Sequence, residues 1–223
     1  APASATSAAL SASSARAMAS APPTPVIARV SPDTGFSDSD ALTLTNTLEV
    51  SGTAQANALV SIFLDGQAGA HQVGSVVADD FGQWQLDLSP LAIAAGSHTL
   101  YAKATDLAGN ASGMTAAFAL TIDQTAPNAV TSLTLNGRPD AELTNSATLA
   151  LTGVAEPGSH VWLRLDGQAL STVTAHASTG VWSYTSTSVL SDGPHNLSLQ
   201  VEDAAGNLGM LRTQIFTVDT VPP

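Results

Sequence analysis

The sequence predicts an all-β protein made of two copies of one small module. Three observations lead to this prediction: landmark residues recur about one hundred positions apart, apolar and polar residues alternate with a period of two, and turn-forming residues separate the alternating runs. Solenoid repeats are only about 20 to 50 residues long, so a repeat of this length corresponds to a whole domain. We therefore expect two domains in tandem.

The clearest recurring landmark is a five-residue turn motif, Asp-x-x-Gly-Asn, which occurs at residues 106–110 and again at 203–207. The other matched landmarks, first copy then second, are Trp84 and Trp182, His98 and His195, Thr45 and Thr144, 65–67 and 166–168, and 123–127 and 219–223. Their slightly unequal spacings are what insertions in loops between two copies would leave. The predicted boundaries are an Ala- and Ser-rich flexible head or linker at 1–21, a first domain at 22–124 and a second at 125–223.

Each copy contains short runs with the pattern of half-buried strands. In the second copy, His195, Leu197, Leu199 and Val201 alternate with polar residues, so one face of an extended strand is apolar. Runs of this kind in the first copy predict strands at 26–30, 48–52, 59–64, 73–77, 83–88, 98–105 and 116–122.

The segments between the runs are rich in Gly, Asp, Asn and Pro. Asp65-Gly66 and Asp166-Gly167 have the residue types of a tight hairpin turn, whose central positions need positive φ. About seven short antiparallel strands in about 100 residues are typical of an immunoglobulin-like β-sandwich. The predicted fold is all-β, with two tandem immunoglobulin-like β-sandwich domains.

Composition excludes several classes of protein. The 223 residues include 6 basic and 18 acidic side chains, a net charge of −12, and Lys103 is the only lysine, so a nucleic-acid partner is not expected. The absence of cysteine excludes disulfide scaffolds and thiolate metal sites. The sequence contains no run of 18 apolar residues, so it predicts no membrane span. Residues 1–21 lack the charged start and apolar centre of a secretion signal. The chain starts without Met, and we expect it to be part of a longer protein.

Taken together, these motifs resemble the bacterial Ig-like repeats of giant type I-secreted surface adhesins. The resemblance covers residues 22–223 and rests on an Asp-rich loop at 33–40, the strand starts at 82–84 and 96–100, the Asp-x-x-Gly-Asn turns and the closing segment 123–127. It implies an extracellular or cell-surface location, a role in adhesion and biofilms, and stalks in which neighbouring repeats are the partners and Ca²⁺ lies at the domain junctions. A host or surface ligand would be contacted elsewhere in the full protein. In the second copy, residues 136–140 replace the Asp-rich loop.

The Asp-rich loop also indicates a cation on chemical grounds. Close carboxylates repel by about 1 kcal/mol per pair in water and by more near a protein surface, and a divalent ion would offset that repulsion. Oxygen ligands are those that Ca²⁺ prefers, and extracellular sites often bind it at about 10⁻⁴ to 10⁻³ M. We expect a structural Ca²⁺ at the junction, with ligands from Asp33, Asp38, Asp40 and Asp123, together with Asp203 or Asn207. The alternative is a solvated polar loop without an ion.

Other candidate sites have structural explanations. In the Asp-x-x-Gly-Asn turns, Asp accepts hydrogen bonds from the turn and Gly or Asn tolerates positive φ, so Asp106 and Asp203 are useful without a ligand. His98 and His195 recur at one strand position, which favours packing or hydrogen bonding over zinc binding. Trp84 and Trp182 could form a sugar-stacking platform, but their position in core strands favours burial. No nucleophile elbow or phosphate-binding loop occurs, so we predict no catalytic residues and no enzyme.

The function that these observations favour is a structural stalk or extender segment of a secreted bacterial adhesin. Tandem Ig-like domains would be stiffened by Ca²⁺ at their junction, and the segment would be a monomer. The alternative is a carbohydrate- or protein-binding Ig-like module of a secreted adhesin or of a polysaccharide-degrading enzyme. That alternative predicts an exposed aromatic strip or a long variable loop, and we identify neither in the sequence.

Overall fold

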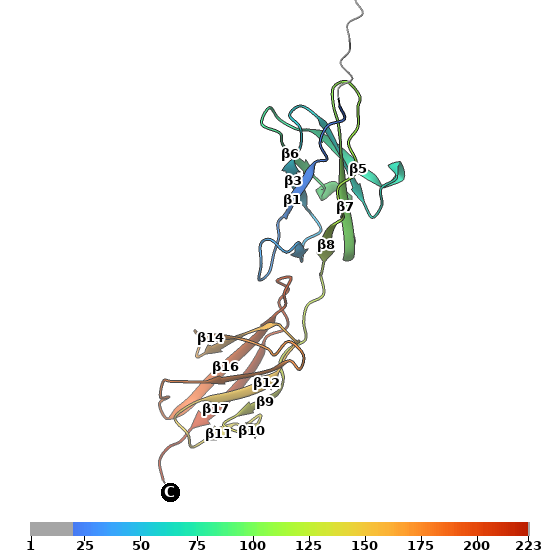
Figure 1. Ribbon diagram of the computed structural model, residues 1–223. Coiled ribbons are helices and arrows are strands. Elements are labelled where there is room, and N and C mark those ends of the chain that lie inside the picture. Colours follow the sequence, from blue (N-terminus) through green and yellow to red (C-terminus); the bar gives the residue numbers. More distant parts are fainter. Residues whose placement is uncertain (1–19, 223) are drawn as a thin grey trace, which may run out of the picture. The chain divides into compact units, whose positions relative to one another are not determined.

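The computed structural model describes residues 20–222 as two β-sandwiches, each with its own pair of sheets (Figure 1). Within these residues the helical segments are two 3₁₀ turns of three residues each, η1 (Gly69–His71) and η2 (Ser89–Leu91). No helix in this range is long and apolar enough to cross a bilayer. The predicted all-β class and the two tandem sandwiches are confirmed. The predicted head at 1–21 lies, apart from Ser20 and Ala21, outside the described residues.

The first sandwich consists of a three-stranded and a five-stranded sheet. The three-stranded sheet has the order β1 (Val26–Ser31), β3 (Glu49–Thr53), β6 (Gln83–Asp87). The five-stranded sheet has the order β2 (Leu42–Thr43), β8 (Phe118–Ile122), β7 (Gly96–Thr105), β4 (Leu59–Leu64), β5 (Gln72–Val77). All seven predicted strands are present, with ends shifted by at most two residues.

The second sandwich repeats this arrangement. Its four-stranded sheet has the order β10 (Arg138–Pro139), β9 (Thr131–Leu135), β12 (Ala150–Val154), β15 (Val181–Thr185). Its five-stranded sheet has the order β11 (Leu143–Thr144), β17 (Arg212–Val218), β16 (Gly193–Glu202), β13 (His160–Leu165), β14 (Gln168–Thr174). The two-residue strands β2 and β11 pair in parallel with β8 and β17. These strands are too short to give an alternating pattern, so the sequence did not predict them.

The core of each sandwich is made by the inward residues of the alternating strands. In β16, Leu197, Leu199 and Val201 are fully buried, and in β7 Leu100, Ala102 and Ala104 are too. The second core also contains Trp182 from the opposite sheet. Trp84 and Trp182 are 3% and 2% exposed, so their predicted burial is confirmed.

The two predicted hairpin turns differ. In the second sandwich Asp166 (φ 51°) and Gly167 (φ 79°) alone connect β13 to β14, as a tight hairpin requires. In the first sandwich Asp65 also has positive φ (54°), but Gly66 does not, and η1 lies between β4 and β5. The prediction of a tight turn at Asp65-Gly66 is therefore wrong. Additional residues before β5 make the connection between β4 and β5 longer. Gly66 therefore does not occupy the centre of a tight turn.

Candidate metal-binding residues

The Asp33 carboxylate lies at the start of the loop that follows β1. Its Oδ2 accepts a hydrogen bond from the backbone N–H of Ala41 at 2.9 Å. Its Oδ1 is buried and accepts no hydrogen bond from any described residue. Burial raises the pKa of Asp33 above its ordinary value of 3.8, the Ala41 hydrogen bond opposes this, and the charges of Asp40 and Asp38 raise the pKa further. An orphaned, partly buried carboxylate oxygen is costly unless a cation or water reaches it.

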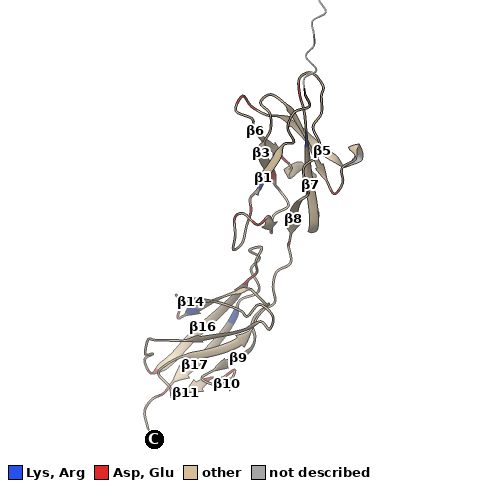
Figure 2. Cartoon of the chain, in the orientation of Figure 1, with Lys and Arg blue, Asp and Glu red and all other residues tan. Residues whose placement is uncertain are grey.

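Asp38 and Asp40 are exposed on the same loop. Asp40 Oδ1 accepts a hydrogen bond from Leu42 N–H at 3.1 Å, which leaves its second oxygen for another partner. Figure 2 marks the positions of the acidic residues in red, in the loops and at strand ends, as expected for a chain rich in Asp. Among the residues that the structure describes, no three acidic or histidine side chains are gathered closely enough to hold a metal ion. The exposed carboxylates would therefore have to move inward to join Asp33 around an ion.

Asp123 lies at the same end of the first sandwich as the Asp-rich loop. Its backbone N–H donates to Thr43 O at 2.9 Å, and the Thr43 hydroxyl donates to Pro32 O at 3.1 Å. The Asp123 carboxylate accepts a hydrogen bond from Thr125 N–H at 2.9 Å, so one of its oxygens is used locally. The predicted proximity of Asp123 to the loop is thus present, although the oxygens do not converge.

The other two predicted ligands are bonded to each other. Both oxygens of Asp203 accept hydrogen bonds from Asn207, one from its backbone N–H and one from its side-chain amide, each at 2.8 Å. Asp106 and Asn110 have the same arrangement in the first sandwich, at 2.8 and 2.9 Å. These bonds account for the recurring Asp-x-x-Gly-Asn motif as a self-contained turn.

His195 and Asp166 form a second charged arrangement, within the second sandwich. His195 Nδ1 lies 2.8 Å from Asp166 Oδ2, and its Nε2 lies 2.9 Å from Ser191 O. Both neighbours are acceptors, so both ring nitrogens donate only when the imidazole is protonated. The Ser191 carbonyl and the Asp166 carboxylate accordingly raise the pKa of His195 above 6.5, against the effect of burial. As predicted from its recurrence, His195 has a hydrogen-bonding role, and His98 Nε2 likewise lies 2.8 Å from Ala94 O.

The repeated geometry agrees with a comparison against known families. The family model of the bacterial Ig-like domain matches the chain twice, at residues 20–124 and 131–220. The chain belongs to this family. Among curated proteins, no sequence matches this bacterial Ig-like chain.

Solved structures share its fold at low identity. Fibronectin(III)-like modules of Clostridium thermocellum CbhA are 16% identical, with a TM-score of 0.48 over 86% of this chain and 94% of theirs. A 1.5-MDa bacterial ice-binding adhesin is 23% identical, with a TM-score of 0.41 over 89% of this chain and 64% of that one. A tetra-tandem repeat from the extending region of a large adhesion protein is 22% identical, with a TM-score of 0.37 over 81% and 48%. These likenesses concern the fold.

The His195–Asp166 pair gives the second Ig-like domain a pH-dependent stability. Because the pKa of His195 is raised, its contribution is full below pH 6.5 and is lost as the pH rises through the folded-state pKa. Hydrogen bonds from Asn196 N–H and then His195 lower the pKa of Asp166 below 3.8, so its contribution is present above that value and is lost in stronger acid. Asp166 is 49% exposed, which limits the whole effect to about 1 kcal/mol.

We expect the free energy of unfolding of this domain to fall by about 1 kcal/mol between pH 5.5 and 8.5, and Asp166→Asn to reduce that dependence while the part due to the Ser191 carbonyl remains. Calorimetry of the full chain at several pH values measures it, with His176→Gln, which changes an exposed histidine of the same domain, as the control. An equal pH slope in Asp166→Asn and the unsubstituted chain would contradict this prediction.

Sequence reasoning about the two Ig-like domains missed one side chain of functional interest. Trp162 in β13 is 47% exposed, unlike Trp84 and Trp182. The signal was present in the alternation of this strand, because Val161 and Leu163 point into the core and Trp162 between them must point outward.

Proposed function

We propose that this chain is a structural extender segment of a bacterial surface adhesin, located outside the cell. The observation that supports this most directly is the tandem duplication of one Ig-like domain, matched twice by the same family model. A spacer gains length from each added copy, whereas an active site gains nothing from duplication in series. The partners of such a segment are further Ig-like domains of the same protein.

We also propose that Ca²⁺ binds at the end of the first sandwich where Asp33, Asp38, Asp40 and Asp123 lie. The orphaned Oδ1 of Asp33 supports this proposal, because a cation would satisfy a buried oxygen that no described residue satisfies. The neighbouring carboxylates of Asp38 and Asp40 repel Asp33 in the absence of an ion. Asp203 and Asn207 are left outside this ligand set because both carboxylate oxygens of Asp203 accept hydrogen bonds from Asn207, and one of these bonds holds the side-chain amide of Asn207 in the turn.

Calcium should stabilise the first sandwich selectively. With a dissociation constant of about 10⁻⁴ to 10⁻³ M, 10 mM Ca²⁺ would add about 1.4 to 2.7 kcal/mol to its free energy of unfolding. Calorimetry of the full chain with Ca²⁺ and with EDTA measures this difference, and isothermal titration measures the affinity. Asp33→Asn should abolish the gain.

The matched control is Asp80→Asn, which removes the same charge from another exposed loop of the first sandwich and should keep the calcium effect. No titration heat at millimolar Ca²⁺ would refute the calcium site. The stiffening of the link between domains has a separate test in small-angle scattering, where a narrower distribution of dimensions is expected with Ca²⁺ than with EDTA. Unchanged distributions despite measured binding would refute the stiffening alone.

A further inference from the structure

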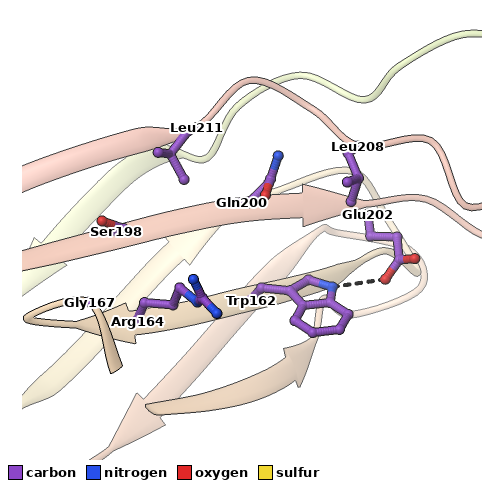
Figure 3. A pocket seen from close by; sticks show the side chains of 8 residues that line it. All are labelled: Trp162, Arg164, Gly167, Ser198, Gln200, Glu202, Leu208 and Leu211. Atoms are coloured by element: carbon purple, nitrogen blue, oxygen red, sulfur yellow. Dashed lines mark hydrogen bonds between the residues drawn. The ribbon is translucent and has the colours of Figure 1, made fainter. Parts of the chain in front are cut away.

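A groove of about 610 Å³ lies on the outer face of the five-stranded sheet in the second sandwich (Figure 3). β13 and β16 form its floor, and the segment that follows the Asp203–Asn207 turn forms one wall. Its lining residues are Trp162, Arg164, Gly167, Ser198, Gln200, Glu202, Leu208 and Leu211. All of them belong to this one sandwich, and none takes part in the proposed calcium site.

Hydrogen bonds hold both sides of the groove in place. Trp162 Nε1 donates to Glu202 Oε2 at 2.8 Å, so the indole is fixed in orientation although it is 47% exposed. Gln200, directly opposite Trp162 in the β13–β16 register, donates through Nε2 to Gly209 O at 3.1 Å. That bond ties the floor to the wall formed by Leu208 and Leu211, both more than half exposed. The groove therefore has an ordered aromatic side and an ordered aliphatic side.

The polar groups of the groove include a cation that has no partner in the described part of the chain. Arg164 lies two residues from Trp162 on the same face of β13, opposite Ser198. Within residues 20–222 its guanidinium forms no ion pair or hydrogen bond, whereas that of Arg212 bonds to Asp140 and to Val130 O. The groove thus offers the donors of Arg164 and the oxygens of Ser198 and Glu202 beside an aromatic face.

The fold itself does not require this groove. In the first sandwich the register position of the Trp162–Gln200 pair is occupied by Ser61 and Lys103. The counterpart of Arg164 is Phe63, which is buried. A stalk built from two equivalent spacers would not need an exposed indole in only one of them, and a half-exposed tryptophan with convergent polar groups is typical of a binding site.

We propose that this groove binds a pyranose unit of a polysaccharide. A pyranose has an apolar C–H face that can stack on Trp162 and a rim of hydroxyls that both donate and accept hydrogen bonds, which matches the mixture of Arg164, Ser198 and Glu202. Arg164 can in addition pair with the carboxylate of a uronic acid, in the two-pronged geometry of a guanidinium. Recognition of a sugar goes beyond the extender role and does not depend on calcium.

The test uses the full chain with two probes, cellohexaose as a neutral glucan and tetragalacturonate as a uronate. Trp84 and Trp182 are buried, so acrylamide quenching of fluorescence reports mainly on Trp162, and a bound sugar should protect it. Isothermal titration with EDTA present gives the affinity. We expect binding of at least one probe, weakened about tenfold or more by Trp162→Ala. Val181→Ala, an exposed change on the opposite sheet, should leave the affinity unchanged.

Arg164→Gln distinguishes binding of the uronate from binding of the neutral glucan. If the uronate binds more tightly, this substitution should remove that preference and spare the glucan. The proposal is overturned if neither probe protects Trp162 or gives heat at millimolar concentration, or if Trp162→Ala binds as the unsubstituted chain does. It is also overturned if sedimentation shows a dimer that Trp162→Ala dissociates, because the groove would then be an interface between copies.

Discussion

Replacing Trp182 with alanine is expected to lower the free energy of unfolding of the second sandwich by about 3 to 5 kcal/mol. The indole is 2% exposed and lies within the apolar core formed by both sheets. It also covers Gly153, its direct partner on β12, so its loss would leave a cavity against bare backbone. Domains of this size are stable by only about 5 to 15 kcal/mol, and the thermal midpoint should fall by about 4 to 8 °C per kcal/mol.

Two other substitutions distinguish the effect of losing core packing on stability from the effect of removing any tryptophan. Trp182→Phe should cost far less, because the indole N–H is buried with no hydrogen-bond partner among residues 20–222 and its removal relieves that penalty. Trp162→Ala, on the surface, should shift the transition by less than about 1 kcal/mol. Calorimetry of the full chain measures all three, with the transition of the first sandwich as the internal reference. Equal losses for Trp182→Ala and Trp162→Ala would contradict the assignment of Trp182 to the core.

The parts of the fold that the sequence predicted are those determined by periodicity and repetition. The alternation of β16 defines an inward face that includes Leu197 and Leu199, and the structure buries both. The repeat also related Asp123 to Asp219. In each sandwich the N–H of this Asp donates at 2.9 Å to the carbonyl of the final residue of the short strand that pairs in parallel with the last strand, Thr43 in β2 or Thr144 in β11. Local pattern and repeat spacing are sufficient to predict such features, because the features depend on strand direction alone.

Features that depend on side-chain geometry were not accessible in the same way. The sequence identified which acidic residues share one end of the first sandwich and that Asp203 accepts hydrogen bonds within its turn, but not that the side-chain amide of Asn207 donates one of them. Trp162 illustrates a different limit. Its outward position followed from alternation, whereas the groove requires Leu208 and Leu211 to fold back beside β16, a placement set by tertiary packing.

The second large effect is expected from Gly52→Ala, which should destabilise the first sandwich by about 3 kcal/mol. Gly52 is buried in the middle strand of the three-stranded sheet, where a Cβ atom would lie 1.9 Å from Val26 O on β1 and 2.7 Å from Trp84 Cζ2. A backbone carbonyl cannot rotate away as a side chain can, so the methyl group must displace β1 from the sheet or push the indole out of its site.

Gly69→Ala in the same sandwich provides the matched control. A Cβ at Gly69 meets nothing within 4 Å, and its φ is not in the left-handed region, so the change should stay within about 0.5 kcal/mol. Hydrogen exchange of residues 26–31 distinguishes the two ways of relieving the clash: faster exchange in Gly52→Ala indicates displacement of β1, whereas unchanged exchange with red-shifted tryptophan emission indicates movement of Trp84. For the equivalent Gly153→Ala, the three atoms nearest the added Cβ all belong to the ring of Trp182, at 2.7 to 3.0 Å. This substitution should therefore perturb tryptophan emission without exposing a strand, and equal strand exposure in both variants would show that the Val26 carbonyl is not the decisive contact.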